Sequence, residues 1–539
     1  MNKNELLNLY KNHIIEVRHT TYGETYIEVD KNDLYEIVTE VVSMLNGTLM
    51  TMVCVDELKY SQKGVIADKK YRYKIYYAFR IPGGVKHDEI SKELLVIVTG
   101  VSEDEPEIYS ITDICLAANW YEREIFDMFG IYPQNHLDLT GLVHHHNFPK
   151  SVFPMRKDFI ASTQIDAVNK IETDHKVQGG GTYLLPVGPI HAGIIEPGHF
   201  RFSCFGEHII NLDAQLFYTH KGLEKISEGM GVLNANFISE RVCGVCSLSH
   251  SVAYSQAVEK INMVEVPERA RAIRVILLEL ERISGHLTDL MGIAVDVAYY
   301  HASNYISRLR EDVMSAAYEV LRSRYFRSIN MPGGLRRDIG ADSIKKLLNA
   351  ALKIKKEISV AEDMLYNSTT FLERVETTGR LFTKTARAIG VVGVGARGSN
   401  IHCDARKAFS YETYGKLDFK EILHDKLDVY ARMSVRFGEI KESAGIIEQS
   451  AASLKAGPVS IKIDKPAPFK PAFGITEAPR GEHTHFIIFD EESKIYRYHI
   501  RSASYANWLA LTFAVKGDIV PDFPVINKSF NLCYCSCDK

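Results

Sequence analysis

The spacing of hydrophobic and polar residues changes along the chain, and the first 160 residues contain two different periods. In some segments apolar residues recur at every third or fourth position, which is the spacing of an amphipathic helix. In others apolar and polar residues alternate, which is the spacing of a half-buried β-strand. Together they predict a small α/β domain over residues 1–160. The expected helices cover residues 32–45 and 120–128, the second ending at Gly130, and the expected strands cover residues 48–55, 71–81 and 94–98.

A polar segment, residues 161–181, separates this domain from a region of different character. It ends in three glycines, a composition that disfavours regular structure and predicts a linker. Beyond it, long helical periods predict an antiparallel bundle within a mostly α-helical domain over residues 182–539. The expected fold class is therefore α+β, a small α/β domain followed by a larger helical one. The expected bundle helices begin at Pro267, cover residues 309–323, and run from Asp342 past Ile358.

Charge and hydropathy exclude several classes of protein. The formal net charge is −4, so there is no basic excess to hold nucleic acid. The sequence contains no run of about 18 apolar residues, which is the length needed to span a membrane. The first residues lack the apolar core of a secretory signal. We expect a soluble protein, which can still dock on a membrane partner.

Five of the nine cysteines fall in two tight clusters. Cys243 and Cys246 form a CxxC pair, and Cys533, Cys535 and Cys537 lie among the last seven residues. An odd number of cysteines without a secretory signal argues against a disulfide framework. Two thiolates at CxxC spacing can chelate one soft metal, and a metal would hold a terminus that otherwise frays. The two clusters therefore predict a single four-thiolate site.

Other interpretations of these and neighbouring motifs stay open. A structural zinc site, a thioredoxin-like redox pair or buried cysteines that are close only by chance would also explain the thiols. Residues 393–398 match GxGxxG, but no convincing helix follows, so a glycine-rich loop near a buried site is favoured over dinucleotide binding. Three histidines at 144–146 could bind metal, but the following Asn147 and Pro149 favour a solvated loop.

Several motifs together resemble the large subunits of [NiFe]-hydrogenases, in the membrane-associated branch that is related to complex I. The match covers nearly the whole chain and is similar to the formate-hydrogenlyase type (hydrogenase 3 or 4), in which a 30-kDa-like part is fused to a 49-kDa-like part. The motifs are residues 240–246 followed by His250 (first nickel signature), 477–481 (arginine segment), 186–189, 196–201 and 220–224 (complex-I-related branch), and 122–131 and 153–159 (30-kDa part).

The resemblance implies a centre of nickel and of iron carrying CO and cyanide, held by four thiolates. Cys243, Cys246 and Cys533 match three family ligands, but Ser536 stands where the fourth cysteine is expected. If the end of the chain is helical, residues three or four apart share a face, and Cys537 would replace the missing ligand. We expect this arrangement, and keep Cys535 as the alternative for an extended end.

The resemblance also implies roles for residues around the metals in the reversible formation of H2 from protons and electrons. Glu196 is the candidate proton relay, and Arg480 would lie over the open coordination position. Arg241, Pro479 and His250 would border the cofactor, with Arg241 helping to keep the thiols ionised. Glu224 is a weaker candidate for holding a structural cation, Mg or Fe.

The implied assembly is a complex on the inner face of the cell membrane, with this subunit peripheral on the cytoplasmic side. Its partners would be a small iron–sulfur hydrogenase subunit, a ferredoxin-like iron–sulfur subunit and antiporter-like membrane subunits. Formate dehydrogenase or ferredoxin would supply electrons. The alternative is a complex-I-like coupling subunit with a degenerate metal site and no hydrogenase activity. Relatives of that kind lack the cysteine pairs, so the thiols favour a hydrogenase.

Overall fold

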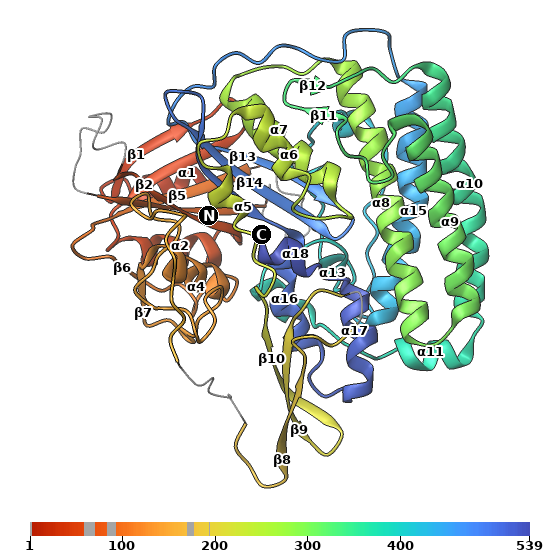
Figure 1. The fold of residues 1–539 in the computed structure, drawn as a ribbon, viewed down its shortest axis with the longest axis horizontal. Helices are drawn as coiled ribbons and strands as arrows, with labels where there is room; N and C mark the ends of the chain where they lie inside the picture. Colours follow the sequence, from red (N-terminus) through yellow and green to blue (C-terminus); the bar gives the residue numbers. More distant parts are fainter. Residues whose placement is uncertain (1–2, 59–70, 83–92, 170–176, 193–194) are drawn as a thin grey trace.

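In a computed structural model, which describes residues 3–58, 71–82, 93–169, 177–192 and 195–539, the chain adopts an α+β fold (Figure 1). Its N-terminal part is a five-stranded sheet in the order β1-β2-β5-β4-β3. β2 and β5 run parallel, and the other neighbours are antiparallel. The strands are β1 (Ile14–His19), β2 (Glu24–Val29), β3 (Thr48–Asp56), β4 (Tyr73–Ile81) and β5 (Glu93–Val101).

Both faces of this sheet are covered. On one face lie α2 (Leu34–Ser43) and α4 (Ala118–Phe129), which ends at Gly130 in the left-handed conformation, as predicted. On the other face lies a second sheet, β13-β14-β15, and the ring centroids of Tyr76 and Phe486 are 5.1 Å apart across the interface. The prediction that residues 71–81 form a half-buried strand is therefore wrong about burial, although the strand exists. The second sheet consists of β13 (Ala472–Ala478), β14 (Gly481–Phe489) and β15 (Ile495–Arg501).

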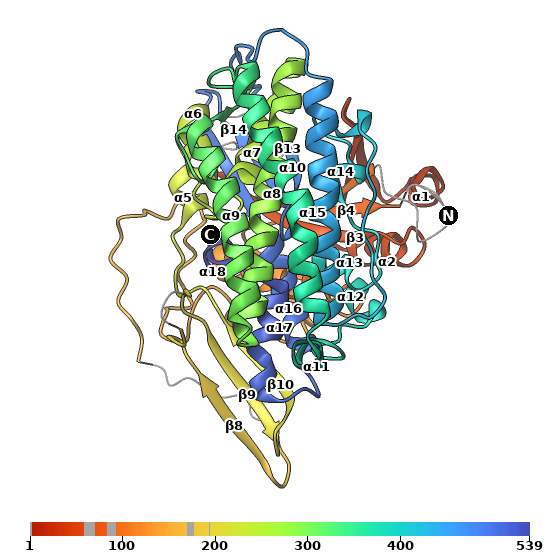
Figure 2. The same cartoon turned by 90° about the vertical axis from the view of Figure 1, so that its right-hand side faces the viewer.

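Four long helices form a bundle beside the second sheet (Figure 2). Three of them were predicted from their apolar period. α8 follows directly after Pro267, and α10 begins at Ala341, next to the expected Asp342. α9 begins at Tyr300, nine residues before the expected start at residue 309. The fourth, α15, was not predicted, because Arg432, Arg436 and Glu439 interrupt its apolar pattern although all three are buried. The four are α8 (Glu268–Asp296), α9 (Tyr300–Leu321), α10 (Ala341–Tyr366) and α15 (Val429–Ala452).

A ribbon of three strands, β10-β9-β8, projects from the body of the molecule (Figure 1). The described parts of the segment 161–181 before it contain no helix or strand. Within the described residues we find no helix that is long and apolar enough to cross a bilayer. The ribbon comprises β8 (Thr182–Val187), β9 (His199–Phe205) and β10 (His208–Gln215).

Shorter elements complete the fold. The histidines at 144–146 lie in a loop, as predicted, but it is not fully solvated: the His144 ring stacks on Phe148 with centroids 3.9 Å apart. The short elements are α1 (Lys3–Leu9), β6 (Glu107–Tyr109), β7 (Tyr132–Gln134), α5 (Leu223–Ser227), α6 (Val232–Ser239), α7 (Ser247–Ile261), β11 (Asn330–Met331), β12 (Gly334–Leu335), α11 (Thr369–Val375), α12 (Thr383–Ala388), α13 (Gly393–Arg397), α14 (Ala405–Ala408), α16 (Ala503–Ala514), α17 (Phe523–Phe530) and α18 (Tyr534–Asp538).

A helix and a strand approach each other very closely where α7 crosses β13. A Cβ atom at Gly474 of β13 would overlap the backbone carbonyl oxygen of Ala253 in α7. Only glycine permits this contact, because the obstacle is backbone and cannot move aside as a side chain could. The contact fixes the helix that follows Cys246 against the strand that leads to Arg480.

Gly474→Ala is expected to lower the free energy of unfolding by about 3 kcal/mol, because α7 and β13 must separate to admit the methyl group. Thermal unfolding of the purified chain, followed by circular dichroism, measures the change. Gly445→Ala in α15 is the control, because no atom lies within 4 Å of its added Cβ and alanine favours a helix. A Gly474→Ala chain as stable as the Gly445→Ala control would contradict this packing.

Candidate metal centre

Four cysteines gather where the C-terminal segment meets the start of α7. The Cys533 sulfur lies 3.7 Å from the Cys243 sulfur and 3.3 Å from the Cys535 sulfur. One nitrogen of Arg480, Nη1, lies 3.5 Å from the Cys243 sulfur and 3.9 Å from the Cys246 sulfur. The two cysteine clusters, 290 positions apart in the sequence, therefore meet in space.

The conformation of Cys533 decides which of the remaining C-terminal thiols joins the cluster. Cys533 is the N-cap of α18 and has an extended backbone, with φ −96° and ψ 119°. Its side chain therefore does not share a helical face with residues three or four positions later. Cys535 turns back toward Cys533, whereas Cys537 is fully buried in the main hydrophobic core. The expectation of Cys537 required Cys533 to lie inside the helix, and the structure instead brings the alternative, Cys535, to the cluster.

Helix α8 holds both sequence motifs of the centre in place. Glu281 accepts hydrogen bonds from the backbone N–H groups of Leu248, at 2.7 Å, and Ser249, at 3.0 Å. These are N–H groups in the first turn of α7, which have no acceptor within their own helix. The next residue, Arg282, donates to the backbone carbonyls of Glu477 at 2.7 Å and Ala478 at 3.0 Å. The CxxC pair and the arginine segment are thus fixed to the same helix.

The glycine-rich segment 393–398 supports the arginine segment from the other side. Gly393 has φ +64°, and a Cβ there would overlap the Arg480 carbonyl oxygen. Gly481 has φ +130°, and its added Cβ would lie 2.8 Å from the Gly393 Cα. The predicted position near a buried site is confirmed, although the segment forms the short helix α13 rather than a loop.

The charges of the cluster are mutually stabilising. Burial alone would lower the pKa of Arg480, but the neighbouring Cys243, Cys246 and Cys533 outweigh it and raise that pKa, so the guanidinium stays charged. Hydrogen bonds from Cys243 and Cys535 lower the pKa of Cys533 well below its usual range, and Arg480 adds to this effect. A set of soft sulfur donors, two buried and two partly exposed, in which Cys533 favours the thiolate form, suits a thiophilic metal such as nickel, iron or zinc.

Other predicted site residues lie around the cluster. The Arg241 side chain is half exposed and pairs with Glu240 at 3.0 Å, so Arg480 and not Arg241 is the cation that contacts the thiols. Pro479 packs on α8, where a Cβ at Gly285 would lie 2.6 Å from it. Glu196 is half-buried in the loop before β9. The hydrogen bond to Cys533, then burial and the charge of Glu196, raise the pKa of Cys535.

A group of buried histidines lies beside the cluster, and only His250 was predicted. The rings of His250 and His483 stack with centroids 3.9 Å apart and planes at 9°. His250 Nδ1 lies 2.9 Å from His485 Nε2, and His485 Nδ1 lies 2.8 Å from the Tyr498 hydroxyl. Burial lowers the pKa of all three histidines, so the rings are neutral. The signal for the missed pair was an H-x-H pattern just after the arginine segment.

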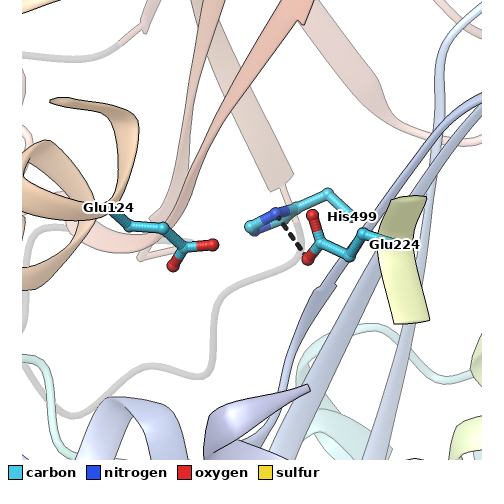
Figure 3. Close-up of side chains that lie close together, drawn as sticks. All are labelled: Glu124, Glu224 and His499. Atoms are coloured by element: carbon cyan, nitrogen blue, oxygen red, sulfur yellow. Dashed lines mark ion pairs between the residues drawn. The ribbon is translucent and has the colours of Figure 1, made fainter. Parts of the chain in front are cut away.

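Glu224 lies away from the thiols, in a second cluster with Glu124 and His499. One ligand atom from each of the three residues lies within 4.8 Å of the others. Figure 3 shows Glu124 approaching from α4 toward the Glu224 carboxylate and the His499 ring. Lys539 also reaches this cluster and contacts both carboxylates. Glu124 and Lys539 were not predicted here, because residues so far apart in the sequence give no local signal.

Three protein families match successive parts of the chain. Residues 27–164 match the family described as respiratory-chain NADH dehydrogenase, 30 Kd subunit. Residues 221–294 match nickel-dependent hydrogenase. Residues 296–472 and 464–539 match respiratory-chain NADH dehydrogenase, 49 Kd subunit. The nickel-dependent hydrogenase match contains the CxxC pair and Glu281.

The chain is 32% identical over 525 residues to formate hydrogenlyase subunit 5 of Escherichia coli, covering 96% of this chain and 90% of the relative. It is 33% identical to hydrogenase-4 component G of the same organism, covering 87% of this chain and 81% of the relative. It is 29% identical to the C/D subunit of the NADH-quinone oxidoreductase of Bacteroides thetaiotaomicron, covering 83% and 89%. Among solved structures it resembles a chain of the membrane-bound sulfane sulfur reductase, an archaeal respiratory membrane complex, with TM-score 0.63 and 28% identity, covering 67% and 99%.

Glu281→Ala is expected to lower the free energy of unfolding by about 3 kcal/mol, because two buried N–H groups lose their acceptor at roughly 1–3 kcal/mol each. Urea unfolding of the purified chain measures this. Glu319→Ala is the control, because Glu319 forms an exposed ion pair with Lys346 on the bundle surface and should change stability by less than about 0.5 kcal/mol. Equal stability of the two variants would mean that Glu281 does not hold α7.

Proposed function

We propose that this chain, which belongs to the complex-I-related family of [NiFe]-hydrogenase large subunits, forms hydrogen reversibly from protons and electrons as the catalytic subunit of an energy-converting, membrane-associated complex. The observation that carries the proposal is the cluster of Cys243, Cys246, Cys533 and Cys535 beside Arg480. A coupling subunit that binds no metal would have no need for four clustered thiols, two of them buried and two partly exposed, beside a buried cation.

The four thiols are suited to hold nickel and an iron that carries CO and cyanide. Cys243, Cys246, Cys533 and Cys535 would hold these metals. When bound, this centre supplies the redox chemistry of proton reduction, which no protein side chain can provide. Sulfur donors favour such metals over hard cations like Mg²⁺.

The surrounding residues supply charge and a route for protons. Arg480 holds a fixed positive charge against the thiols and needs no rearrangement to stabilise negative charge there. Glu196 lies close enough to Cys535 to raise the pKa of that thiol, after the larger effects of the bond to Cys533 and of burial. We assign Glu196 as the proton relay because its carboxylate is half-buried, so that it is partly open to water, and because its charge acts on Cys535.

The proposed partners follow from the complexes in which the relatives occur. The names of the relatives include a formate hydrogenlyase and a hydrogenase-4 component, and the similar solved chain belongs to a respiratory membrane complex. We therefore propose a small iron–sulfur subunit, a ferredoxin-like subunit and antiporter-like membrane subunits as partners. Electrons would come from formate dehydrogenase or ferredoxin, and the subunit would lie peripherally on the inner face of the cell membrane.

A second candidate function is that of a coupling subunit without hydrogenase activity. Two observations favour it: the similarity to an NADH-quinone oxidoreductase subunit, and Ser536 in place of the expected cysteine. In that case the thiols would hold another metal, such as zinc, or none. Metal content separates these possibilities.

The purified complex is expected to contain nickel and iron, to show infrared bands of CO and cyanide, and to release hydrogen when given a low-potential reductant. Cys535→Ala should lose nearly all nickel, because a soft ligand is removed from the site. Cys537→Ala is the matched control and should retain nickel, because Cys537 lies in the hydrophobic core. Elemental mass spectrometry of the two purified variants measures which of them loses more nickel. A wild-type complex with zinc or with no metal would instead support the second function.

Glu196→Gln is expected to lower hydrogen production by at least about 100-fold while the nickel content stays unchanged, because glutamine keeps the size of the side chain but carries no exchangeable acid proton. Gas chromatography of hydrogen, normalised to nickel, measures this. Glu207→Gln in the exposed turn between β9 and β10 is the control. Full activity in Glu196→Gln would assign the relay to another group.

A further inference from the structure

A buried acidic pair, Glu124 and Glu224, has the geometry of a cation site (Figure 3). Glu124 projects from α4, and Glu224 projects from α5, beside His499 of β15. Glu224 is 6% exposed, and its Oε1 accepts a hydrogen bond from the backbone N–H of Ile500 at 3.0 Å. Two carboxylates buried together require positive charge between them.

That positive charge is present in the chain itself. The Lys539 ammonium nitrogen lies 2.7 Å from Glu124 Oε1 and 3.2 Å from Glu224 Oε1, and the lysine side chain is 3% exposed. The nitrogen also lies 4.8 Å from the centroid of the Tyr505 ring. Burial alone would lower the pKa of Lys539, but Glu124 and Glu224 outweigh it and raise that pKa, so the amine is charged.

The charges around the pair are balanced without a metal. Arg497 donates to Glu224 Oε2 at 2.7 Å, so two cations face two carboxylates. His499 is neutral, because burial lowers its pKa, and its Nε2 lies 3.0 Å from the Thr51 hydroxyl. A divalent ion added to these contacts would leave two uncompensated positive charges in a buried place, which is strongly unfavourable.

We propose that the Lys539 ammonium takes the position of a divalent cation between Glu124 and Glu224, so that this chain holds no Mg²⁺ or Fe²⁺ there. The residues present do not fit the structural metal that the family resemblance led us to expect at Glu224. The inference goes beyond the proposed hydrogenase function and does not depend on it, since it concerns a separate group of residues and an ion that takes no part in the reaction.

The ammonium also fixes the segment that carries the thiols. The backbone of the same residue is bonded too. The Lys539 backbone N–H donates to the Cys535 carbonyl at 3.3 Å, and the Lys539 carbonyl accepts from the Lys221 backbone N–H at 2.8 Å. The adjacent Asp538 accepts from the backbone N–H groups of Phe217 and Thr219, each at 2.9 Å. The ion pair with Glu124 thereby ties α18 to α4, a helix of the N-terminal part, without a metal.

Binding of Mn²⁺ to the full-length chain, followed by electron paramagnetic resonance, tests the substitution. The wild type should show no Mn²⁺ site that depends on Glu224, because the ammonium fills the position. Lys539→Ala should gain one such site, and Lys539→Ala with Glu224→Gln should bind Mn²⁺ at least about tenfold more weakly. One Glu224-dependent Mn²⁺ ion in the wild type would overturn the proposal, as would the absence of a site in folded Lys539→Ala.

A second measurement separates the charge of Lys539 from its size. Lys539→Met should lower the melting temperature by about 3 °C or more, because two largely buried carboxylates lose a counter-charge, whereas Lys539→Arg should stay near the wild type. Lys346→Met on the bundle surface is the control, because its ion pair with Glu319 is exposed. Equal melting temperatures for Lys539→Met and the control would also overturn the proposal. Neither measurement uses hydrogenase activity, so failure of the proposed function would leave both results interpretable.

Discussion

Charge that is buried behind the thiol cluster has to be paired, and this requirement fixes how the bundle meets the second sheet. Arg397 of α13 lies 2.6 Å from Glu439 of α15 and 2.8 Å from Glu477 of β13. Arg282 of α8 lies 3.2 Å from Glu279 and also donates to the carbonyl of Glu477. A shift of any one element would leave a charge without its partner in the interior, which costs about 3–5 kcal/mol. β13, the strand that leads to Arg480, is therefore held by ion pairs as well as by packing.

The same requirement explains which parts of the fold the sequence could predict. Helix α10 buries an entirely apolar face, and α8 keeps an apolar period through residues 273–290 although Glu281 and Arg282 are also buried, so the periods of both are visible in the sequence. Helix α15 turns Arg432, Arg436 and Glu439 inward and gives no clear period, because their partners lie on other elements. Nothing in the sequence indicated that both faces of the N-terminal sheet are covered. One face is covered by strands that begin more than 370 positions after the end of β5. The division into domains at residues 160 and 182 stays a prediction.

For the centre itself, motifs predicted which segments meet, but not the local geometry. The CxxC pair and the arginine segment came together as their spacing and resemblance indicated. The choice between Cys535 and Cys537 depended on the backbone of Cys533, because an N-cap residue has extended dihedrals although a helix follows it. Lys539 and Glu124 are 415 positions apart, and no pattern in the sequence connects them.

The covering of the N-terminal sheet by β13–β15 has a consequence for the time course of biosynthesis. Ala472 is added to the growing chain about 370 residues after Val101, so at roughly 5–20 residues per second the sheet is complete roughly 20–70 s before its cover exists. During that interval Val53, Tyr76 and Val96 form an open apolar surface on the nascent chain. Such a surface associates readily with other unfolded chains. Until β13–β15 have been made, this surface has to be kept apart from other chains, so the yield of folded protein depends on the nascent chain as well as on the final stability.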